Sequence, residues 1–321
     1  MNNSASCISV SQKESIRGQL LATGACAVGF APAEQVPPHE WNLFEEWLDR
    51  GDNAGMAYMH NYPEIRRDPR LLLDNAKTVI SLAFPFKPEK WRDGTNGIIA
   101  SYAYGRDYHK ELRKLLKPEL KKISEETGGA KFRICIDSAP VLERYWGEKT
   151  GIGFRGDNGC LIIPGYGSMV FLTEIITDLK IPEDSPLHSD CGHCGACIKA
   201  CPGNAIGDGG TIDCRKCISY LSIEHRGEWD TPESLQTMNT PQGRNTIFGC
   251  DICLRVCPHN RNVPSTTITA FQPSDTILNI KVDDLREVTS DEELNSLIPS
   301  SPISRAGIAG IYRNINYKLN N

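Results

Sequence analysis

Residues 191–202 read CGHCGACIKACP, and this stretch decides how the chain is organised. Its cysteines follow the spacing Cys-x2-Cys-x2-Cys-x3-Cys-Pro, by which bacterial ferredoxins hold 4Fe–4S clusters. In that arrangement three thiolates from a tight turn bind three corners of one cluster. The fourth cysteine begins the next segment and binds a second cluster. The motif therefore predicts two clusters rather than one.

A second cysteine motif follows at residues 250–258, which read CDICLRVCP. Counted back from its Cys-Pro, the position of the first cysteine is occupied by Ile247, so one thiolate must come from elsewhere. Cys214 or Cys217 can supply it. The predicted ligands of the first cluster are Cys191, Cys194, Cys197 and Cys257. Those of the second cluster are Cys201, Cys250, Cys253 and one of Cys214 or Cys217.

The cysteine count favours metal ligation in a reducing compartment over disulfide bonds. The chain has 13 cysteines, and nine of them fall between Cys191 and Cys257. Disulfide-built domains are richer in cysteine, and they are secreted. A zinc ribbon is the alternative, since Cys191-x2-Cys194 followed by Cys214-x2-Cys217 fits its spacing. Zinc would leave Cys197, Cys201 and the whole second motif without a role.

Length and composition exclude several classes of protein. The chain has 321 residues, of which 40% are hydrophobic and 23% charged, enough for one large or two ordinary domains. A net charge of −5 excludes a wholly basic surface for polyanions but allows a local basic face. No apolar run approaches the ~18 residues of a membrane span. The N-terminus lacks the pattern of a secretory signal, so we expect a cytoplasmic protein.

Hydrophobic patterning predicts an α+β fold in three parts. Residues 1–184 alternate helices and strands as an α/β domain, residues 185–262 form a bacterial two-cluster ferredoxin-like domain, and residues 263–321 form a partly irregular C-terminal segment that packs on the core. Helices are expected over residues 11–22, 39–50, 108–126 and 140–149. Strands are expected over residues 25–30, 78–84, 97–103, 132–136, 160–163 and 169–172.

Asp137, in the sequence IDSAP at residues 136–140, has two interpretations. It ends a predicted strand, where an acidic side chain can act as a general acid with a raised pKa. It also precedes Pro140 and a helical pattern, as the capping residue of a helix does. The residues alone favour the cap.

Other motifs of the first domain are weaker. Asp107-Tyr108-His109 is close to the Asp-x-His-x-x-Gly element that donates a histidine to cobalamin, but Leu112 stands in place of the glycine. Helix packing is therefore the preferred interpretation. From Arg106 to Lys122 there are seven Lys or Arg against three Asp or Glu, which is either an RNA-facing strip or a solvated helix face. The glycines at 151, 153 and 156 follow a helical pattern rather than a strand, so they do not predict a dinucleotide site.

Taken together, these motifs resemble the epoxyqueuosine reductase family, which are cobalamin- and iron–sulfur-dependent enzymes of tRNA modification. The ferredoxin-type motif alone is shared by many proteins, but its combination with IDSAP and with CISYL at residues 217–221 is specific to this family. The resemblance extends over nearly the whole chain. Further matching stretches are Arg67-x-x-Arg70-Leu71-Leu72, Gly105-x-Asp107-Tyr108-His109, Gly151-Ile152-Gly153-Phe154, Tyr166-Gly167-Ser168 and Arg313-Asn314.

The resemblance implies a set of roles. Cys217 would be the eighth cluster ligand, leaving Cys214 free, and Asp137 would be the proton donor rather than a cap. Cobalamin would bind the first domain base-off. The family's positions near the corrin correspond to Arg67, Ala100, Asn158, Leu161 and Leu172. For Ala100, Leu161 and Leu172 the contact could only be backbone or apolar.

The implied reaction converts epoxyqueuosine at the tRNA wobble position into queuosine and water, using two electrons and two protons. An external low-potential donor would reduce the clusters, the clusters would reduce cobalamin, and Asp137 would protonate the departing oxygen. The family resemblance also suggests a monomer.

The chain departs from the family pattern in two respects. Many members have Lys-Asn where this chain has Asp157-Asn158, so any contact made by that lysine is lost or replaced. Some relatives carry a helical repeat domain that helps to hold tRNA, and we expect a short form without it. The cluster domain and the catalytic face would then bind tRNA, with His225 and Arg226 as candidate contacts.

Two other functions fit parts of the pattern. A reductive dehalogenase-like enzyme would use the same cofactors on a small molecule, and tRNA binding distinguishes the two. A ferredoxin-type electron carrier would bind the clusters and no cobalt.

Overall fold

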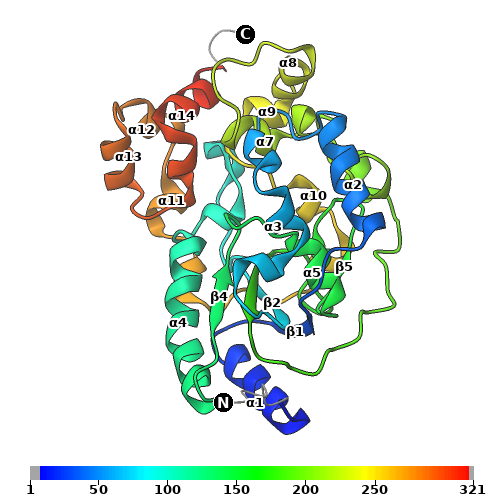
Figure 1. Ribbon diagram of the computed structural model, residues 1–321. Coiled ribbons are helices and arrows are strands. Elements are labelled where there is room, and N and C mark those ends of the chain that lie inside the picture. Colours follow the sequence, from blue (N-terminus) through cyan, green and yellow to red (C-terminus); the bar gives the residue numbers. More distant parts are fainter. Residues whose placement is uncertain (1–7, 318–321) are drawn as a thin grey trace.

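The computed structural model describes residues 8–317, and a four-stranded sheet forms the centre of its first part (Figure 1). The strands lie in the order β1 (Ala27–Pro32), β2 (Thr78–Pro85), β7 (Val170–Thr177) and β4 (Phe132–Cys135). Every neighbouring pair is antiparallel. The predicted α+β class is confirmed, and no two neighbouring strands of this sheet are parallel. Strands β2 and β4, which a long helix joins, run parallel to each other on either side of β7.

Helices cover both faces of this sheet because the central strands are apolar on both sides. All eight residues of β2 are buried. On one face Ile80 and Ile175 pack with α1 (Val10–Leu21) and α4 (Tyr108–Glu126). On the other face Val79 and Ile176 pack with Trp41 of α2 (Pro38–Asp49) and with Trp146 of α5 (Glu143–Lys149). The sheet is therefore the middle layer of three.

Helix α4 has the bounds that its sequence pattern predicts. Leu112, Leu116, Leu120 and Ile123 recur at helical spacing and are buried on the sheet. Asp107 caps the helix, because its carboxylate accepts a hydrogen bond from the backbone of His109. This cap fixes the first turn of α4 beside the end of β4.

The cluster domain is made of short elements. They are α6 (Ala196–Ala200), α7 (Ile218–Ile223), α8 (Pro232–Met238), α9 (Pro241–Arg244), β8 (Thr246–Phe248) and α10 (Ile252–Arg255). Strand β8 pairs in parallel with β3 (Ile98–Ile99) and so ties this domain to the first. The remaining elements of the first part are α3 (Pro63–Arg67) and the antiparallel pair β5 (Phe154–Arg155) and β6 (Leu161–Ile162).

The strand predicted over residues 97–103 is wrong beyond Ile99. Residues 101–103 form a 3₁₀ turn instead. The backbone amide of Ala100 donates to the Phe248 carbonyl at 2.7 Å, and that of Ser101 donates to the Asp251 carboxylate at 2.5 Å. These contacts come from residues about 150 positions later in the chain, so local patterning does not contain them.

The C-terminal segment is more regular than predicted. It forms α11 (Asp275–Asn279), α12 (Val282–Arg286), α13 (Asp291–Leu297) and α14 (Gly307–Asn316). These short helices surround Leu294, Ile311 and Ile315, which share an apolar core with Phe248 of β8. The segment packs on the body of the protein, and the boundaries given above for the three parts stay predictions.

Arg313 and Asn314 fasten α14 to the cluster domain. The Arg313 guanidinium donates to the carbonyls of His225, Gly227 and Leu221, and the Asn314 amide donates to those of Ser222 and Ile247. Both side chains are buried. We call this pair of residues the carboxyl-terminal clamp.

Replacing Asn314 with alanine is expected to lower the free energy of unfolding by about 2–4 kcal/mol, because two buried carbonyls lose their donor. Urea unfolding measures the change. Asn316→Ala, two residues further along the same helix, is the matched control and should change stability by less than about 0.5 kcal/mol.

In the described part of the chain, no helix combines the length and apolar composition needed to cross a bilayer. The N-terminal residues on which the secretory-signal expectation rests lie partly outside the described range, and so does Cys7.

Candidate active site and cluster sites

Asp137 lies on the loop that follows β4, with its backbone in the left-handed region at φ +51°. Its Oδ2 accepts a hydrogen bond from Nε2 of His109 at 3.0 Å, and half of the side-chain surface stays open. Helix α5 begins only at Glu143, and the residue before it makes no side-chain cap. The helix-cap interpretation of Asp137 is therefore wrong.

His109 lies between two carboxylates. Its Nδ1 is 2.8 Å from Asp107 and its Nε2 is 3.0 Å from Asp137. Burial lowers the pKa of His109, but the hydrogen bonds and negative charges of both partners outweigh it and raise that pKa to about 9. Because both ring nitrogens of His109 contact carboxylates, neither is free to bind a metal. This agrees with the sequence, in which Leu112 replaces the glycine of the cobalamin-binding motif.

The aromatic ring of Tyr108 holds His109 in place. The imidazole stacks on this ring with the centroids 4.1 Å apart, and Tyr108 stacks in turn on Phe171 of β7 at 4.3 Å. Tyr108 and Asp137 also interact through their side chains, which lowers the pKa of Asp137. Helix packing, which the sequence pattern favours for this region, accounts for Tyr108 but not for the two carboxylates that flank His109.

The pKa of Asp137 is shifted in the direction opposite to that predicted. Removal of water by the surrounding protein raises it, but the hydrogen bond and charge of His109, helped by Arg305 and Tyr108, hold the pKa below its ordinary value. In the resting site the proton therefore resides on His109, and Asp137 is its carboxylate partner.

Two further carboxyl groups lie behind Asp137. Glu174 belongs to a stretch that matches the family, Tyr166-Gly167-Ser168-x-x-x-Leu172-x-Glu174, but no pattern predicts a role for it or for Glu143. Glu143 Oε1 accepts a hydrogen bond from the backbone amide of Asp137 at 2.8 Å. Burial, and then the charge of Asp137, raise the pKa of Glu143 to about 7. Glu174, fully buried on β7, has its pKa raised well above the ordinary value by burial and by Glu143. A reserve of protonated carboxyl groups thus lies under the loop.

Arg305 brings a positive charge from the C-terminal segment to this corner. It forms an ion pair with Glu224. Its charge also lowers the pKa of Asp137. No motif marks Arg305, and its distance along the chain hides it from local patterning.

The candidate cobalamin contacts lie in several places. Leu161 and Leu172 share one apolar cluster with Ala83 and Ile152. Ala100 is buried at the start of the 3₁₀ turn. The two remaining candidates, Asn158 and Arg67, have polar side chains.

Asn158 and Arg67 carry donors that fit an amide-rich ligand. Asn158 is 6% exposed, and its Nδ2 has no partner among the described residues. The guanidinium of Arg67 lies over the Trp41 ring, and its Nε lacks a partner in the same range. Corrin side chains are amides that accept hydrogen bonds, so these two donors fit the implied group.

The cysteines of the first predicted cluster come together around Cys257. The thiols of Cys194 and Cys191 raise the pKa of Cys257, and Cys257 in turn raises that of Cys197, although burial is the larger cause for both. Asp157 and His193 lie beside this set, with His193 Nδ1 2.7 Å from the Asp157 carboxylate. Asp157, at the position where the family resemblance leads us to expect lysine, thus forms a hydrogen bond with His193.

The cysteines of the second predicted cluster form a separate group. Burial, and then neighbours that include Cys217 and Cys201, raise the pKa of Cys250, while Cys250 and Cys217 act on Cys253. Cys214 adjoins Cys217, and both pack against the buried side of α7. All described cysteines are free of disulfides. The ligand assignment itself stays a prediction.

The loop of the second cluster contacts the first domain directly. The buried Asp251, between Cys250 and Cys253, accepts the hydrogen bond from Ser101 described above. Gly249 lies so close that a Cβ added there would be 2.5 Å from the Ala100 side chain. The predicted cluster and a predicted cobalamin contact are thus adjacent.

His225 and Arg226 follow α7 at the edge of this assembly. The guanidinium of Arg226 donates to the carbonyls of Ile223 and Arg305, and His225 Nε2 lies 2.8 Å from the Glu228 carbonyl. Arg226 is exposed. Their assignment to tRNA stays a prediction.

Comparison with known proteins identifies both parts of the chain. A sequence model described as "Epoxyqueuosine reductase QueG, DUF1730" matches residues 66–138, which include Asp137. A model described as "4Fe-4S double cluster binding domain" matches residues 190–260. The second match confirms the predicted pair of iron–sulfur clusters and removes the zinc-ribbon alternative.

Known relatives and solved structures match this chain over nearly its full length. The epoxyqueuosine reductase of Cellulophaga algicola is 38% identical over 303 residues, which cover 94% of this chain and 96% of the relative. A crystal structure of an epoxyqueuosine reductase with an epoxyqueuosine-modified tRNA stem loop matches with a TM-score of 0.85 and 26% identity, over 96% of this chain and 81% of the other.

A structure of the Bacillus subtilis enzyme matches equally well, with a TM-score of 0.85 and 25% identity over 96% of this chain and 81% of the other. In it an aspartate catalytic loop is swung out of the active site. From its sequence, its two matched domains and its fold, the present chain belongs to the epoxyqueuosine reductase family of oxidoreductases.

Proposed function

We propose that this protein reduces epoxyqueuosine to queuosine at the wobble position of tRNA. The observation that carries the proposal is the Asp137–His109 pair, which holds a transferable proton on an open loop of a chain that also contains two sets of cluster cysteines. The relative crystallised with an epoxyqueuosine-modified stem loop supports the choice of substrate.

The proposal includes a cobalamin and two 4Fe–4S clusters held by the residues described above. When bound, these groups supply the two electrons of the reaction from an external low-potential donor. Arg67 and Asn158 would bind the corrin amides, and Leu161 and Leu172 would cover its apolar surface. Cys217 would complete the second set of cysteines, in which Cys250 follows the Gly249 that lies against Ala100.

The protein's own residues manage the protons. Reduction of an epoxide to an alkene consumes two electrons and two protons and releases water. Asp137 takes the first proton from the His109 imidazolium through their 3.0 Å hydrogen bond and passes it to the departing oxygen. Glu143 is the next group that holds a proton near neutral pH, and it contacts the Asp137 backbone. It is positioned to restore the second proton.

The charge on His109 predicts a pH dependence. Folding raises the pKa of His109 from about 6.5 to about 9, so the imidazolium contributes its full stabilisation below about pH 6.5 and loses it as the pH rises through about 9. Turnover should also fall as the pH rises through about 9, because His109 then loses the proton that is to be transferred. The rate constant kcat, measured between pH 6 and pH 10, tests this.

In His109→Gln the amide can still hydrogen-bond Asp137 but has no proton to give. Its kcat should be about 10- to 100-fold lower, and the fall near pH 9 should be absent. Persistence of that fall in His109→Gln would show that another group titrates there.

The proposed function is tested under anaerobic conditions. The protein is reconstituted with iron, sulfide and cobalamin, reduced, and incubated with tRNA that carries epoxyqueuosine. Mass spectrometry of the digested nucleosides should show loss of one oxygen atom only when cobalamin is present. If a known epoxyqueuosine reductase converts the same tRNA and this protein, with its iron and cobalt bound, does not, the substrate assignment is wrong.

A further inference from the structure

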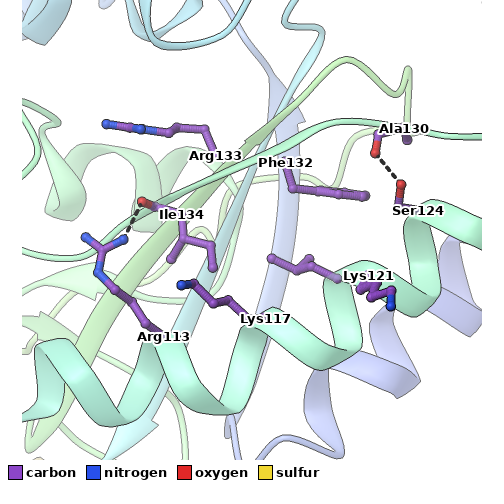
Figure 2. A pocket seen from close by; sticks show the side chains of 9 residues that line it. Arg113, Lys117, Lys121, Ser124, Ala130, Phe132, Arg133 and Ile134 are labelled. Carbon is purple, nitrogen blue, oxygen red and sulfur yellow. Dashed lines mark hydrogen bonds between the residues drawn. The ribbon is translucent and has the colours of Figure 1, made fainter.

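A groove of about 400 Å³ lies between α4 and β4, and none of the residues assigned to the cofactors lines it (Figure 2). Four cationic residues and no acidic one line it. They are Arg113, Lys117 and Lys121 from α4 and Arg133 from β4, whose side chain extends away from α4 (Figure 2). The chain as a whole has a net charge of −5, so this concentration of positive charge does not follow from overall composition.

The cations of the groove are available to a ligand. Lys117, Lys121 and Arg133 are exposed. Among the described residues, Arg113, Lys117 and Arg133 form no ion pair, and Lys121 has only a solvent-exposed contact of 4.0 Å with Glu125. Such an exposed pair contributes a few tenths of a kcal/mol and does not neutralise the groove. Arg113 reaches across it to the Ile134 carbonyl at 3.4 Å.

Both walls of the groove lead to the active site. On α4, Arg113, Lys117 and Lys121 follow His109 at successive intervals of four residues, which places them along one stripe with a rise of about 6 Å per step. On β4, Arg133 precedes Asp137 by four residues. Figure 2 shows Arg113 and Lys117 extending from α4 beside Ile134. At the other end of the groove the Ser124 hydroxyl donates a hydrogen bond to the Ala130 carbonyl.

We propose that this groove binds the phosphate backbone of the RNA whose modified base occupies the Asp137 site. A row of cations at regular steps, starting at the catalytic pair, fits a polyanion that enters the site by one nucleotide and continues along the groove. The inference rests on the proposed function for the identity of the RNA. It adds the path along which the phosphate backbone of the tRNA would be held.

The same cations have a second physical role that the test must separate. Strand β4 is at the edge of the sheet, and charged side chains on an edge discourage pairing with another molecule. If the cationic side chains served only to protect the edge of β4, their removal would increase self-association and leave RNA binding unchanged.

The test compares two double variants of equal charge. Lys117→Gln/Lys121→Gln removes two cations of the groove, and Lys90→Gln/Lys281→Gln removes two exposed lysines elsewhere. The probe is a fluorescein-labelled tRNA transcript whose Kd is measured by anisotropy at several NaCl concentrations. In the groove variant the slope of log Kd against log salt should fall by about 1.4–1.8, since each phosphate contact contributes about 0.7–0.9. The control variant should keep the wild-type slope.

Turnover gives an independent measurement. With epoxyqueuosine tRNA, the groove variant should show a KM raised by roughly tenfold and an unchanged kcat, because the groove positions RNA and takes no part in proton transfer. Charge reversal in Lys117→Glu should increase the effect on KM.

The outcomes distinguish this inference from the proposed function. Wild-type turnover with an unchanged salt slope and KM in the groove variant overturns the groove alone, and new self-association in sedimentation then assigns the cations to edge protection. Absence of wild-type turnover together with a reduced slope in the groove variant overturns the substrate assignment and supports the RNA groove.

Discussion

Replacing Asp137 with asparagine is expected to lower kcat by about 10²- to 10⁴-fold, the usual contribution of a positioned general acid. Asparagine adopts the left-handed backbone conformation as readily as aspartate, so the loop at φ +51° keeps its shape. It accepts a hydrogen bond from His109 but cannot carry a proton. Anaerobic turnover with epoxyqueuosine tRNA, beside iron and cobalt analysis, measures the effect.

The neighbouring Ser138→Ala is the matched control for Asp137→Asn. Ser138 lies on the same loop and is exposed, and its hydroxyl contacts only the Ile136 carbonyl at 3.3 Å. This variant should retain nearly full activity. Full activity of Asp137→Asn with both kinds of cofactor bound would remove Asp137 from the mechanism, and the His109 proton would then have to reach the substrate directly.

Replacing Cys217 with alanine is expected to remove one cluster and abolish turnover. Two 4Fe–4S clusters correspond to about eight irons per chain, so this variant should contain about four. This expectation follows from the family resemblance, and it is consistent with the position of Cys217 beside both Cys201 and Cys250. Cys214 is a buried neighbour of Cys217. Iron analysis and electron paramagnetic resonance of the reduced protein measure the loss.

Cys214→Ala is the natural control, because it removes a thiol only three residues away in the same turn. It should keep about eight irons and most of its activity. If Cys214→Ala lost a cluster and Cys217→Ala did not, the eighth ligand would be Cys214 and the assignment from the family resemblance would be reversed.

The sequence predicts those parts of the fold that depend on local patterning. Helix α4 and strand β2 have apolar faces with clear periodicity, and their predicted bounds are close to the observed ones. The turn after Ile99 is different, because Asp251 and Phe248 determine it from far along the chain. The C-terminal helices were missed for a related reason, since they are short and gain their stability from a shared core.

The candidate site also combines features that local sequence predicts with features that residues far apart in the chain determine. Spacing alone predicts the cysteine sets, because cluster geometry constrains the sequence directly. The Asp137 loop depends on the family resemblance, and residues alone suggested a cap that the late start of α5 excludes. The pKa of Asp137 was predicted in the wrong direction because its value depends on His109 and Arg305, which no local pattern connects to it.

The carboxyl-terminal clamp has a consequence for the synthesis and maturation of the protein. Arg313 is synthesised 56 residues after Cys257, a delay of about 3–11 s at ~5–20 residues per second. Until then the carbonyls of Leu221 and Ser222, at the carboxyl end of α7, lack these donors, and the scaffold around Cys217 is unfinished. We therefore expect cluster insertion to be a late event in biogenesis. The time that nascent thiols spend open to oxygen and competing metals is governed by translation speed as well as by the affinity of the finished site.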